Sequence, residues 1–515
     1  MIRDLERDEP VAGEHADVCI VGAGAAGIVL AAELARMGKR VLLLEGGGAA
    51  IEAASQETYA SEVTGLPHRG VHTGRFRAQG GTTTKWGGQI LELDASDFAV
   101  RDWVSGSGWP FAKSELSPYY ERALAMEGLN GVQRSDAKVW QRLGMDEPEL
   151  GVMVSYLSRW CPEPNFAVLH AETLKGESVL VWLHANVVAM EMEGEAVRGV
   201  RCRTLAGREA RFTAERFVFC LGAIESSRFF LQPREGGLPW NASGLLGKHF
   251  QDHIDCNAAE VKPVKVERFH DFFDNIFLDG YKYHPKMRMP AESARVGKSL
   301  NAGATMAFAS DADAAMGELK TTARKILRGN VRDVGVGDAW STVKNLPLLA
   351  RQAWRYKREH RAYNPADARI MLRVHCEQEP TSASSVSLSG ECDALGMLRT
   401  RLDWRISDME QRTILQFAQM AKSALAGLAE VKIDAELLAG DAAFRLRCDD
   451  SNHHMGGMRM GAVSSAGVVD KNLRLFGTKN CYVCSSAVFP TSGYSNPTHT
   501  ILALAVRLAE QLKAG

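Results

Sequence analysis

Residues 17–45 of this 515-residue chain begin with DVCIVGAGAAG and end with RVLLLE, and this stretch decides the fold. Its first apolar run leads into a glycine-rich turn and then into IVLAAELARMG, whose apolar residues recur at helical spacing. The second apolar run completes a strand, helix, strand unit. Such a unit builds a parallel sheet with helices on its faces, so the sequence predicts an α/β fold with a Rossmann-like nucleotide-binding domain.

The turn of this unit carries glycines at the spacing G-x-G-x-x-G. In this motif the first glycine permits the tight turn, the second lets the backbone approach a pyrophosphate, and the third lets the helix pack against the strand. Glu45 ends the second run, at roughly the number of residues after the last glycine where this motif carries an acid that binds a ribose hydroxyl. Such an acid disfavours the 2′-phosphate of NADP. FAD or NAD is therefore expected, and a turn that binds nothing is the alternative. The expected cofactor contacts are Gly22, Gly24, Ala25, Ala26, Gly27, Glu45 and Gly46.

A second glycine-rich stretch, RFRAQGGTTTKWGGQI, occupies residues 75–90. Its backbone N–H groups and threonine hydroxyls suit a phosphate or the edge of an isoalloxazine ring. A plain surface loop is the alternative, although a tryptophan among four glycines is unusual on a solvated loop. The expected contacts here are Gly80, Gly81, Thr82, Thr84, Trp86, Gly87 and Gly88.

The composition favours a small-molecule partner. Lys and Arg together number 61 and Asp and Glu 62, so no strong field attracts nucleic acid. The charged start MIRDLERDEPVAGEHAD lacks the apolar core of a secretory signal, and no apolar run is long enough to cross a bilayer. We therefore expect a cytoplasmic protein without membrane contact, with reduced cysteines and with no metal site. CYVC at 481–484 resembles a redox motif, but its neighbours favour a strand with the two thiols on opposite faces.

These motifs, with four further segments, resemble the glucose/methanol/choline (GMC) flavin oxidoreductases over nearly the whole chain. The further segments are GWPFAKSELSPYYERAL at 108–124, FVFCLGAIESSR at 217–228, LGKHFQDHID at 246–255 and the tail, which contains NHHMGGMRMG and FPTSGYSNPTHT. CEQEPTSASSVSLSGECDALGM at 376–397 looks like the family's substrate-side sheet. The tail looks closest to the bacterial sugar-active, pyranose-oxidase-like branch. The resemblance implies FAD as cofactor and a substrate domain, built on an antiparallel sheet, that interrupts the FAD-binding domain.

The resemblance places the catalytic pair in the tail. Its base stands three residues before the first glycine of the GG pair, at His453, and its partner is Asn496. A neutral imidazole suits proton abstraction, and an amide can donate a hydrogen bond to the developing alkoxide. His454 is the alternative base. Asn496 has an alternative role as N-cap of a helix starting at Pro497, and a purely structural tail is the third possibility.

Further cofactor contacts are implied by the resemblance at Val187, Gly222, Ala223, Ser485, Ser486, Asn496 and Thr498. Two departures from the family pattern matter. Lys85 stands where pyranose oxidases carry a histidine that bonds covalently to the flavin, which favours non-covalent FAD. Ser485 and Ser486 replace the family's usual Asp-Gly or Gly-Ser, so a carboxylate near the pyrophosphate is missing.

The expected activity is oxidation of a CH–OH group of a sugar, glycoside or polyol, with oxygen or another acceptor taking the electrons. A flavin-dependent lyase or decarboxylase, a non-sugar alcohol as substrate, and a non-catalytic flavin protein are the alternatives. The expected FAD-binding domain comprises 1–110, 176–260 and 440–515, and the substrate domain 111–175 and 261–439. Residues 318–361 are basic and helical in pattern, which favours a solvated face over docking to a membrane or partner. The alcohol, the carbon oxidised, the acceptor and the oligomeric state are not encoded in any motif.

Overall fold

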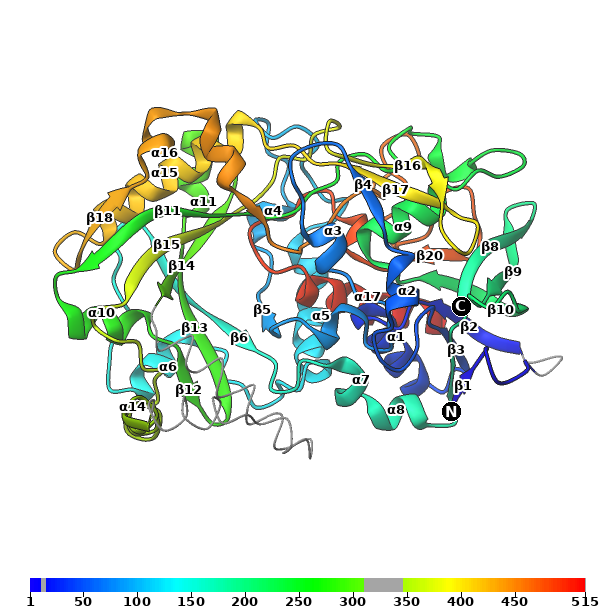
Figure 1. Ribbon diagram of the computed structural model, residues 1–515, viewed down its shortest axis with the longest axis horizontal. Coiled ribbons are helices and arrows are strands. Elements are labelled where there is room, and N and C mark those ends of the chain that lie inside the picture. The colour runs from blue at the N-terminus through cyan, green and yellow to red at the C-terminus, as the bar shows by residue number, and fades with distance from the viewer. Residues whose placement is uncertain (11–14, 310–345, 515) are drawn as a thin grey trace.

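The computed structural model describes residues 1–10, 15–309 and 346–514, which form two large β-sheets with helices around them (Figure 1). The first sheet, on the right of Figure 1, has eight strands in the order β1-β7-β3-β2-β10-β9-β8, with β20 beside β10. Its strands are β1 (Ile2–Asp4), β2 (His15–Val21), β3 (Val41–Leu44), β7 (Val179–Leu183), β8 (Asn186–Glu193), β9 (Ala196–Arg203), β10 (Glu209–Phe219) and β20 (Cys481–Val483).

The predicted βαβ unit forms the centre of this sheet, which confirms the predicted fold class. β2 and β3 pair in parallel, and helix α1 (Ala25–Arg36) connects them. Every residue of β3 is buried, as expected of a parallel strand covered on both faces. The carboxyl ends of β2, β3 and β10 lie together, which is where open α/β sheets bind their ligands.

The second sheet, on the left of Figure 1, has nine strands in the order β18-β11-β15-β14-β13-β6-β5. Strand β12 pairs with β13, and β19 pairs with β11. Its strands are β5 (Gln89–Ile90), β6 (Val154–Trp160), β11 (Ile254–Pro263), β12 (Ile276–Leu278), β13 (Tyr281–Arg288), β14 (Ala302–Ala309), β15 (Arg369–Cys376), β18 (Ala429–Ile433) and β19 (Asp449–Asp450).

One face of the second sheet is apolar and the other is polar. On β15, Ile370, Leu372 and Val374 are buried in a core shared with helices α10 (Val266–Phe273) and α15 (Asp408–Ala424). Alternate residues such as Arg373 and His375 therefore lie on the opposite face. α15 begins at a capping box formed by Ser407 and Glu410.

A third, three-stranded sheet joins β16 (Ser385–Cys392), β17 (Leu398–Asp403) and β4 (Ser61–Val63). β15 belongs to the second sheet, whereas β16 and β17, which follow it along the chain, form a separate hairpin. This hairpin packs on α9 (Gly222–Leu231), beside the first sheet, so residues 376–397 are not part of the large substrate-side sheet, apart from Cys376 at the end of β15.

The remaining helices cover the sheets and connect them. They are α2 (Ala53–Glu57), α3 (Gly70–Thr73), α4 (Ala95–Phe98), α5 (Lys113–Met126), α6 (Asp136–Arg142), α7 (Phe166–Leu169), α8 (Ala171–Lys175), α11 (Ala291–Gly297), α14 (Leu346–Arg358), α16 (Ala435–Ala439), α17 (Thr498–Ala514) and the 3-10 turns η1 (Gly81–Thr84), η2 (Pro239–Asn241), η4 (Ala442–Arg447) and η5 (Ser486–Val488). The helix α17 packs on α1 and α5, which brings the end of the chain back to the first sheet.

Two sequence predictions concern regions that the structure describes only in part. The basic segment 318–361 is helical over α14, and its residues up to 345 lie outside the described ranges. Among the described helices, none combines the length and apolar character needed to cross a bilayer. The domain boundaries given above stay a prediction.

Candidate active site

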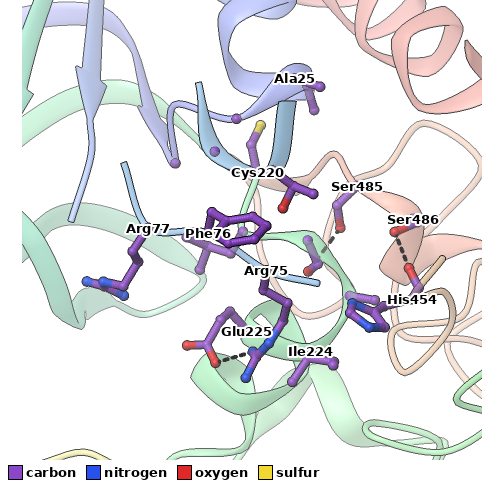
Figure 2. A pocket seen from close by; sticks show the side chains of 18 of the residues that line it. Ala25, Arg75, Phe76, Arg77, Cys220, Ile224, Glu225, His454, Ser485 and Ser486 are labelled. Atoms are coloured by element: carbon purple, nitrogen blue, oxygen red, sulfur yellow. Dashed lines mark hydrogen bonds and ion pairs between the residues drawn. The ribbon is translucent and has the colours of Figure 1, made fainter. Parts of the chain in front are cut away.

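A cavity of about 590 Å³ lies at the carboxyl ends of β2, β3 and β10. Its volume falls within the range typical of ligand sites. The first glycine turn, the second glycine loop, the start of α9 and the C-terminal tail all contribute to its wall. Figure 2 shows part of this wall, with Arg75 and Glu225 on one side and His454 and Ser486 on another.

The glycine turn has the shape that a bound dinucleotide requires. Gly22 has φ +103°, a conformation that favours glycine. A Cβ on Gly27 would lie 1.9 Å from the carbonyl oxygen of Gly22, so a larger residue would force α1 away from the turn. A Cβ on Gly24 would meet no atom within 4 Å, because Gly24 faces the open cavity. Gly22 thus permits the tight turn, Gly27 permits the packing of α1, and Gly24 permits the close approach of a ligand, as the motif predicts.

Glu45 fixes the turn from the end of β3. Its carboxylate accepts hydrogen bonds from the backbone N–H groups of Ala23 at 2.9 Å and Gly47 at 2.8 Å. Burial raises the pKa of this carboxyl, whereas the backbone donors and Arg77 oppose the rise. Each carboxylate oxygen can accept a second hydrogen bond, so Glu45 can still bind a ribose hydroxyl from its place on the cavity wall.

The second glycine loop is bonded directly to the first turn. The N–H of Gly80 donates to the carbonyl of Ala23 at 2.8 Å, and a Cβ on Gly81 would lie 2.9 Å from the Cα of Gly24. Gly80 and Gly81 both have positive φ values, 97° and 53°. The two loops therefore form one glycine-lined wall, which the sequence could show only as two separate stretches.

Most of the predicted cofactor contacts line the cavity. They are Gly22, Gly24, Ala25, Ala26, Glu45, Gly46, Gly81, Thr82, Trp86, Gly87, Val187, Gly222, Ala223, Ser485, Ser486, Asn496 and Thr498. Gly27, Gly80, Thr84 and Gly88 do not line it. Gly27 and Gly80 shape the backbone behind the wall, and the Thr84 hydroxyl donates to the carbonyl of Gly81 at 2.8 Å. Gly88, with φ +84°, lies against Cys161 and Pro164.

One wall of the cavity was not anticipated. The Arg75 guanidinium pairs with Glu225 at 2.9 Å, as Figure 2 shows, and Arg77 donates to the side chain of Asn186. Although burial acts in the opposite direction, the guanidinium groups of Arg228 and Arg75 hold the pKa of Glu225 below its usual value. These residues lie in the motif-bearing segments, but nothing in the sequence distinguished them from ordinary surface charges.

The predicted catalytic pair is brought into contact. The side-chain amide of Asn496 donates to Nε2 of His453 at 3.0 Å, and both residues line the cavity. Burial, reinforced by electrostatic interactions with His253, His375 and Lys286, keeps the pKa of His453 well below its usual value. The His453 ring is therefore neutral and able to accept a proton.

His253, which the sequence analysis did not single out, fixes which nitrogen of His453 is the acceptor. His253 Nε2 lies 3.5 Å from the carbonyl oxygen of Ser492, which can only accept. His253 therefore carries its proton on Nε2 and presents an unprotonated Nδ1, 2.9 Å from Nδ1 of His453. His453 then carries its own proton on Nδ1, which leaves Nε2 unprotonated toward Asn496.

Asp252 holds this loop in place. One of its oxygens accepts the backbone N–H groups of His453 at 2.9 Å and His253 at 2.7 Å. Its other oxygen lies 3.2 Å from Nε2 of His68 and 3.8 Å from Nε2 of His454. His68 Nδ1 accepts from the N–H of Val71 at 3.1 Å, so the proton of neutral His68 is on Nε2 and faces the carboxylate.

His454 differs from His453 in its surroundings. Its ring nitrogen faces the Asp252 carboxylate, and its ring lies 5.3 Å from that of His68. The Ser486 hydroxyl donates to its backbone carbonyl at 2.6 Å (Figure 2). Of the two histidines, only His453 contacts Asn496.

Asn496 is not placed as the predicted cap of α17. The N–H of Ile501 donates to the carbonyl of Pro497 at 2.9 Å, so Pro497, not Asn496, precedes the first turn. α17 begins at Thr498, and the amide of Asn496 points to His453. Because the N-cap position moves to Pro497, the Asn496 side chain is left for the cavity.

The polar face of the second sheet borders the site. Trp160 of β6 and Gln89 of β5 line the cavity, and Gln89 donates to the Ser158 hydroxyl at 3.0 Å. Cross-strand register places His284 of β13 opposite Ser158, on the same face. Tyr494, two residues before Asn496, packs its ring where Gly303 of β14 has no side chain.

Comparison with known proteins agrees with this geometry. The GMC oxidoreductase family matches residues 380–505, which include the catalytic tail, and the NAD(P)-binding Rossmann-like domain matches residues 20–91. The chain carries the C-terminal domain of a GMC oxidoreductase together with a Rossmann-like nucleotide-binding domain. It is therefore an FAD-dependent enzyme that acts on CH–OH groups, and the glycine wall described above fits the dinucleotide part of FAD.

Similar proteins cover nearly the whole GMC chain. A 2-methyl-1,2-propanediol dehydrogenase of Mycolicibacterium austroafricanum is 21% identical over 97% of this chain and 95% of its own. A paromamine 6'-oxidase of Streptomyces fradiae is 24% identical over 96% of this chain and 90% of its own. Among solved structures, pyridoxine 4-oxidase from Mesorbium loti superposes with a TM-score of 0.59 at 18% identity, covering 96% of this chain and 98% of that one.

Proposed function

We propose that this GMC enzyme oxidises a hydroxyl group of a sugar, glycoside or polyol, with His453 as the general base and Asn496 as the hydrogen-bond donor beside it. The contact between His453 Nε2 and Asn496 Nδ2 at 3.0 Å on the cavity wall carries this proposal. A relative named for paromamine and another named for a 1,2-propanediol support a hydroxyl-bearing substrate.

The residues of the site have separate roles in this reaction. FAD, when bound, supplies the electron sink for the hydride of the carbinol carbon. The glycine turn and Glu45 would hold its dinucleotide part, and Thr82, Trp86 and Gly87 are placed to contact the rest. His453 Nε2 takes the hydroxyl proton, and the Asn496 amide stabilises the negative charge that develops on the alcohol oxygen.

His253 acts as a positioning residue in this scheme. The bond from His453 Nδ1–H to His253 Nδ1 keeps His453 in the tautomer whose Nε2 is free, and it stabilises the imidazolium that forms after proton transfer. Replacing His253 with Phe should slow flavin reduction while substrate binding changes little. His253→Asn, whose side-chain oxygen can accept the same hydrogen, should restore part of the rate.

The polar face of the second sheet, which borders the cavity at Trp160 and Gln89, supports a hydroxyl-rich substrate over an apolar alcohol. The adjoining face of the second sheet presents Thr305, His284 and Arg373, whereas its apolar residues point to the core on the other side. Sugars and polyols bind through many hydroxyls and need such donors and acceptors.

The test is anaerobic mixing of the purified enzyme with a panel of alcohols while flavin absorbance is followed. Glycosides and polyols should bleach the flavin, and sterols and aromatic alcohols should not. Bleaching by aromatic alcohols alone would refute the substrate class, and bleaching by no alcohol would refute the activity itself.

We also propose that FAD is held without a covalent bond, because Lys85 occupies the place of the linking histidine on the cavity wall. Acid precipitation should leave a colourless pellet and a yellow supernatant. A yellow pellet would show that another residue makes the bond. Cytoplasmic localisation remains part of the proposal and is testable by fractionation of the producing cells.

A further inference from the structure

A buried lysine on the polar face of the second sheet has no counter-ion in contact with it. Lys286 of β13 is only 6% exposed, and its ammonium group makes no hydrogen bond or ion pair with any residue in the described parts of the chain. Lysine is almost never buried this deeply without a partner, because removing an ammonium group from water costs several kcal/mol. Burial lowers the pKa of Lys286 to about 8, so the group still carries a proton at neutral pH.

The one acidic group whose charge acts on Lys286 is already engaged. Asp255 of β11 accepts hydrogen bonds from Arg373 Nε at 2.7 and 2.9 Å and makes a further bond to its Nη2. This bidentate pair satisfies both carboxylate oxygens with the guanidinium. The charge of Asp255 therefore raises the pKa of Lys286 and partly offsets the effect of burial, although the two side chains are not in contact.

His284 and His375, the neighbours of Lys286 on the same face, also leave ring nitrogens without a hydrogen bond in the described parts of the chain. His284 is two residues away on β13, and its Nδ1 is buried with no hydrogen-bond partner among the described residues, while its Nε2 contacts the Thr305 hydroxyl at 2.6 Å. The nearest carboxylate oxygen to His375, that of Asp255, is 3.9 Å from the ring. Burial and the positive charge of Lys286 keep the pKa values of both histidines well below normal.

This group adjoins the catalytic tail. In the β13, β14 and β15 registers, Arg288 pairs with Gly303 and Gly303 with His375, and the Tyr494 ring covers Gly303. Tyr494 also lies against Tyr156 of β6, the strand partner of Lys286, with ring centroids 6.1 Å apart. Electrostatic interactions with Lys286 and His375 both lower the pKa of His453. The unpaired donors thus lie on the face of the second sheet that borders the cavity at Trp160 and Gln89.

We propose that the alcohol substrate carries an anionic group, a carboxylate or a phosphate, that Lys286 binds with His284 and His375 as neighbouring donors. The proposal rests on the proposed function, since it names the substrate class of the same site. An anion would supply the missing counter-charge, and a charge-assisted hydrogen bond favours an anionic over a neutral ligand by about 10- to 100-fold in binding.

The experiment compares matched substrates that differ only in charge. Methyl glucoside, methyl glucuronide and methyl glucoside 6-phosphate, with the corresponding galactosides and with glycerol and glycerate, are mixed anaerobically with the wild-type holoenzyme. The apparent Kd for flavin reduction should be at least about 10-fold lower for the charged member of the pair that reacts. The carboxylate and phosphate arms show which anion is preferred.

Lys286→Met and Lys262→Met complete the test. Methionine has nearly the volume of lysine without its charge, so Lys286→Met should fold and bind FAD, and it should lose the preference for the anion. Lys262 is exposed on β11 of the same sheet, and Lys262→Met should keep the preference. A preference for the neutral partner, or an anion preference unchanged in Lys286→Met, would overturn the inference and leave the oxidation standing. Absence of flavin reduction by every alcohol would overturn the proposed function first.

Discussion

The FAD wall and the catalytic tail of this protein place their polar groups by different means. In the FAD wall, the first glycine turn and Glu45 lie within one βαβ unit, from Gly22 to Glu45, and they are fixed by the turn itself or by hydrogen bonds from backbone N–H groups. His453 and Asn496 of the tail, in contrast, are joined by His253, which lies 200 residues before His453, and each is held through another side chain. The FAD wall is therefore determined by local backbone geometry, whereas the catalytic site is determined by long-range packing.

The difference implies different responses to mutation. A change in the FAD wall should affect cofactor binding or local packing and leave the chemistry of bound enzyme intact. A change in the catalytic group should leave FAD bound and slow the reaction. The following four predictions test this separation, from the largest expected effect to the smallest.

His453→Ala should slow flavin reduction by roughly 10²–10⁴-fold, the usual contribution of a general base. FAD content and thermal stability should stay close to wild type, because the ring's partners are other side chains of the site. Stopped-flow bleaching under anaerobic conditions gives the rate. His454→Ala is the control and should retain most of the wild-type rate. A normal rate in His453→Ala together with a strongly reduced rate in His454→Ala would show that His454 is the base.

Glu45→Ala should weaken FAD binding by about 1.5–3 kcal/mol, because a charge-assisted bond to the ribose is lost. The protein should purify partly without FAD, and its reduction rate per bound FAD should be unchanged. Glu52→Ala removes a carboxylate in the chain segment that follows β3 and should retain full FAD occupancy. Full occupancy of Glu45→Ala after extensive dialysis would show that Glu45 does not bind the ribose.

Gly27→Ala and Gly24→Ala form a matched pair within the turn. The added methyl at Gly27 would clash with the Gly22 carbonyl, so the free energy of unfolding of the apoprotein should fall by about 1–3 kcal/mol. The methyl at Gly24 meets no protein atom, so the apoprotein should keep its stability while FAD affinity falls. Thermal denaturation of apoprotein and FAD titration separate the two, and equal behaviour of both variants would contradict the assigned roles.

Asn496→Ala should slow flavin reduction by about 10-fold, less than His453→Ala, because the amide orients and stabilises but takes no proton. Since Pro497 and not Asn496 precedes the first turn of α17, the variant should not show the loss of about 1 kcal/mol that accompanies removal of an N-cap. Chemical denaturation measures the second quantity. A destabilisation of that size would show that the Asn496 side chain does cap α17.

The sequence by itself determined the parts of this protein that depend on local backbone geometry. The glycine spacing, the apolar runs beside it and Glu45 specify a βαβ turn, because only glycine tolerates the required φ values and close contacts at those positions. The capping box of α15 is local in the same way. The resemblance of the tail added His453 and Asn496, since their spacing around the glycine pair lies in one continuous segment.

Only the tertiary structure decided which side chains complete the site. His253, Asp252 and Lys286 lie in segments that carry no sign of catalysis, and they reach the site because strands β11 and β13 bring them beside the tail. The tautomer of His453 and the unpaired state of Lys286 depend on which groups happen to face them across such contacts. No spacing along one chain encodes those distances, because they arise when the apolar face of the second sheet is buried and its polar face is turned toward the FAD wall.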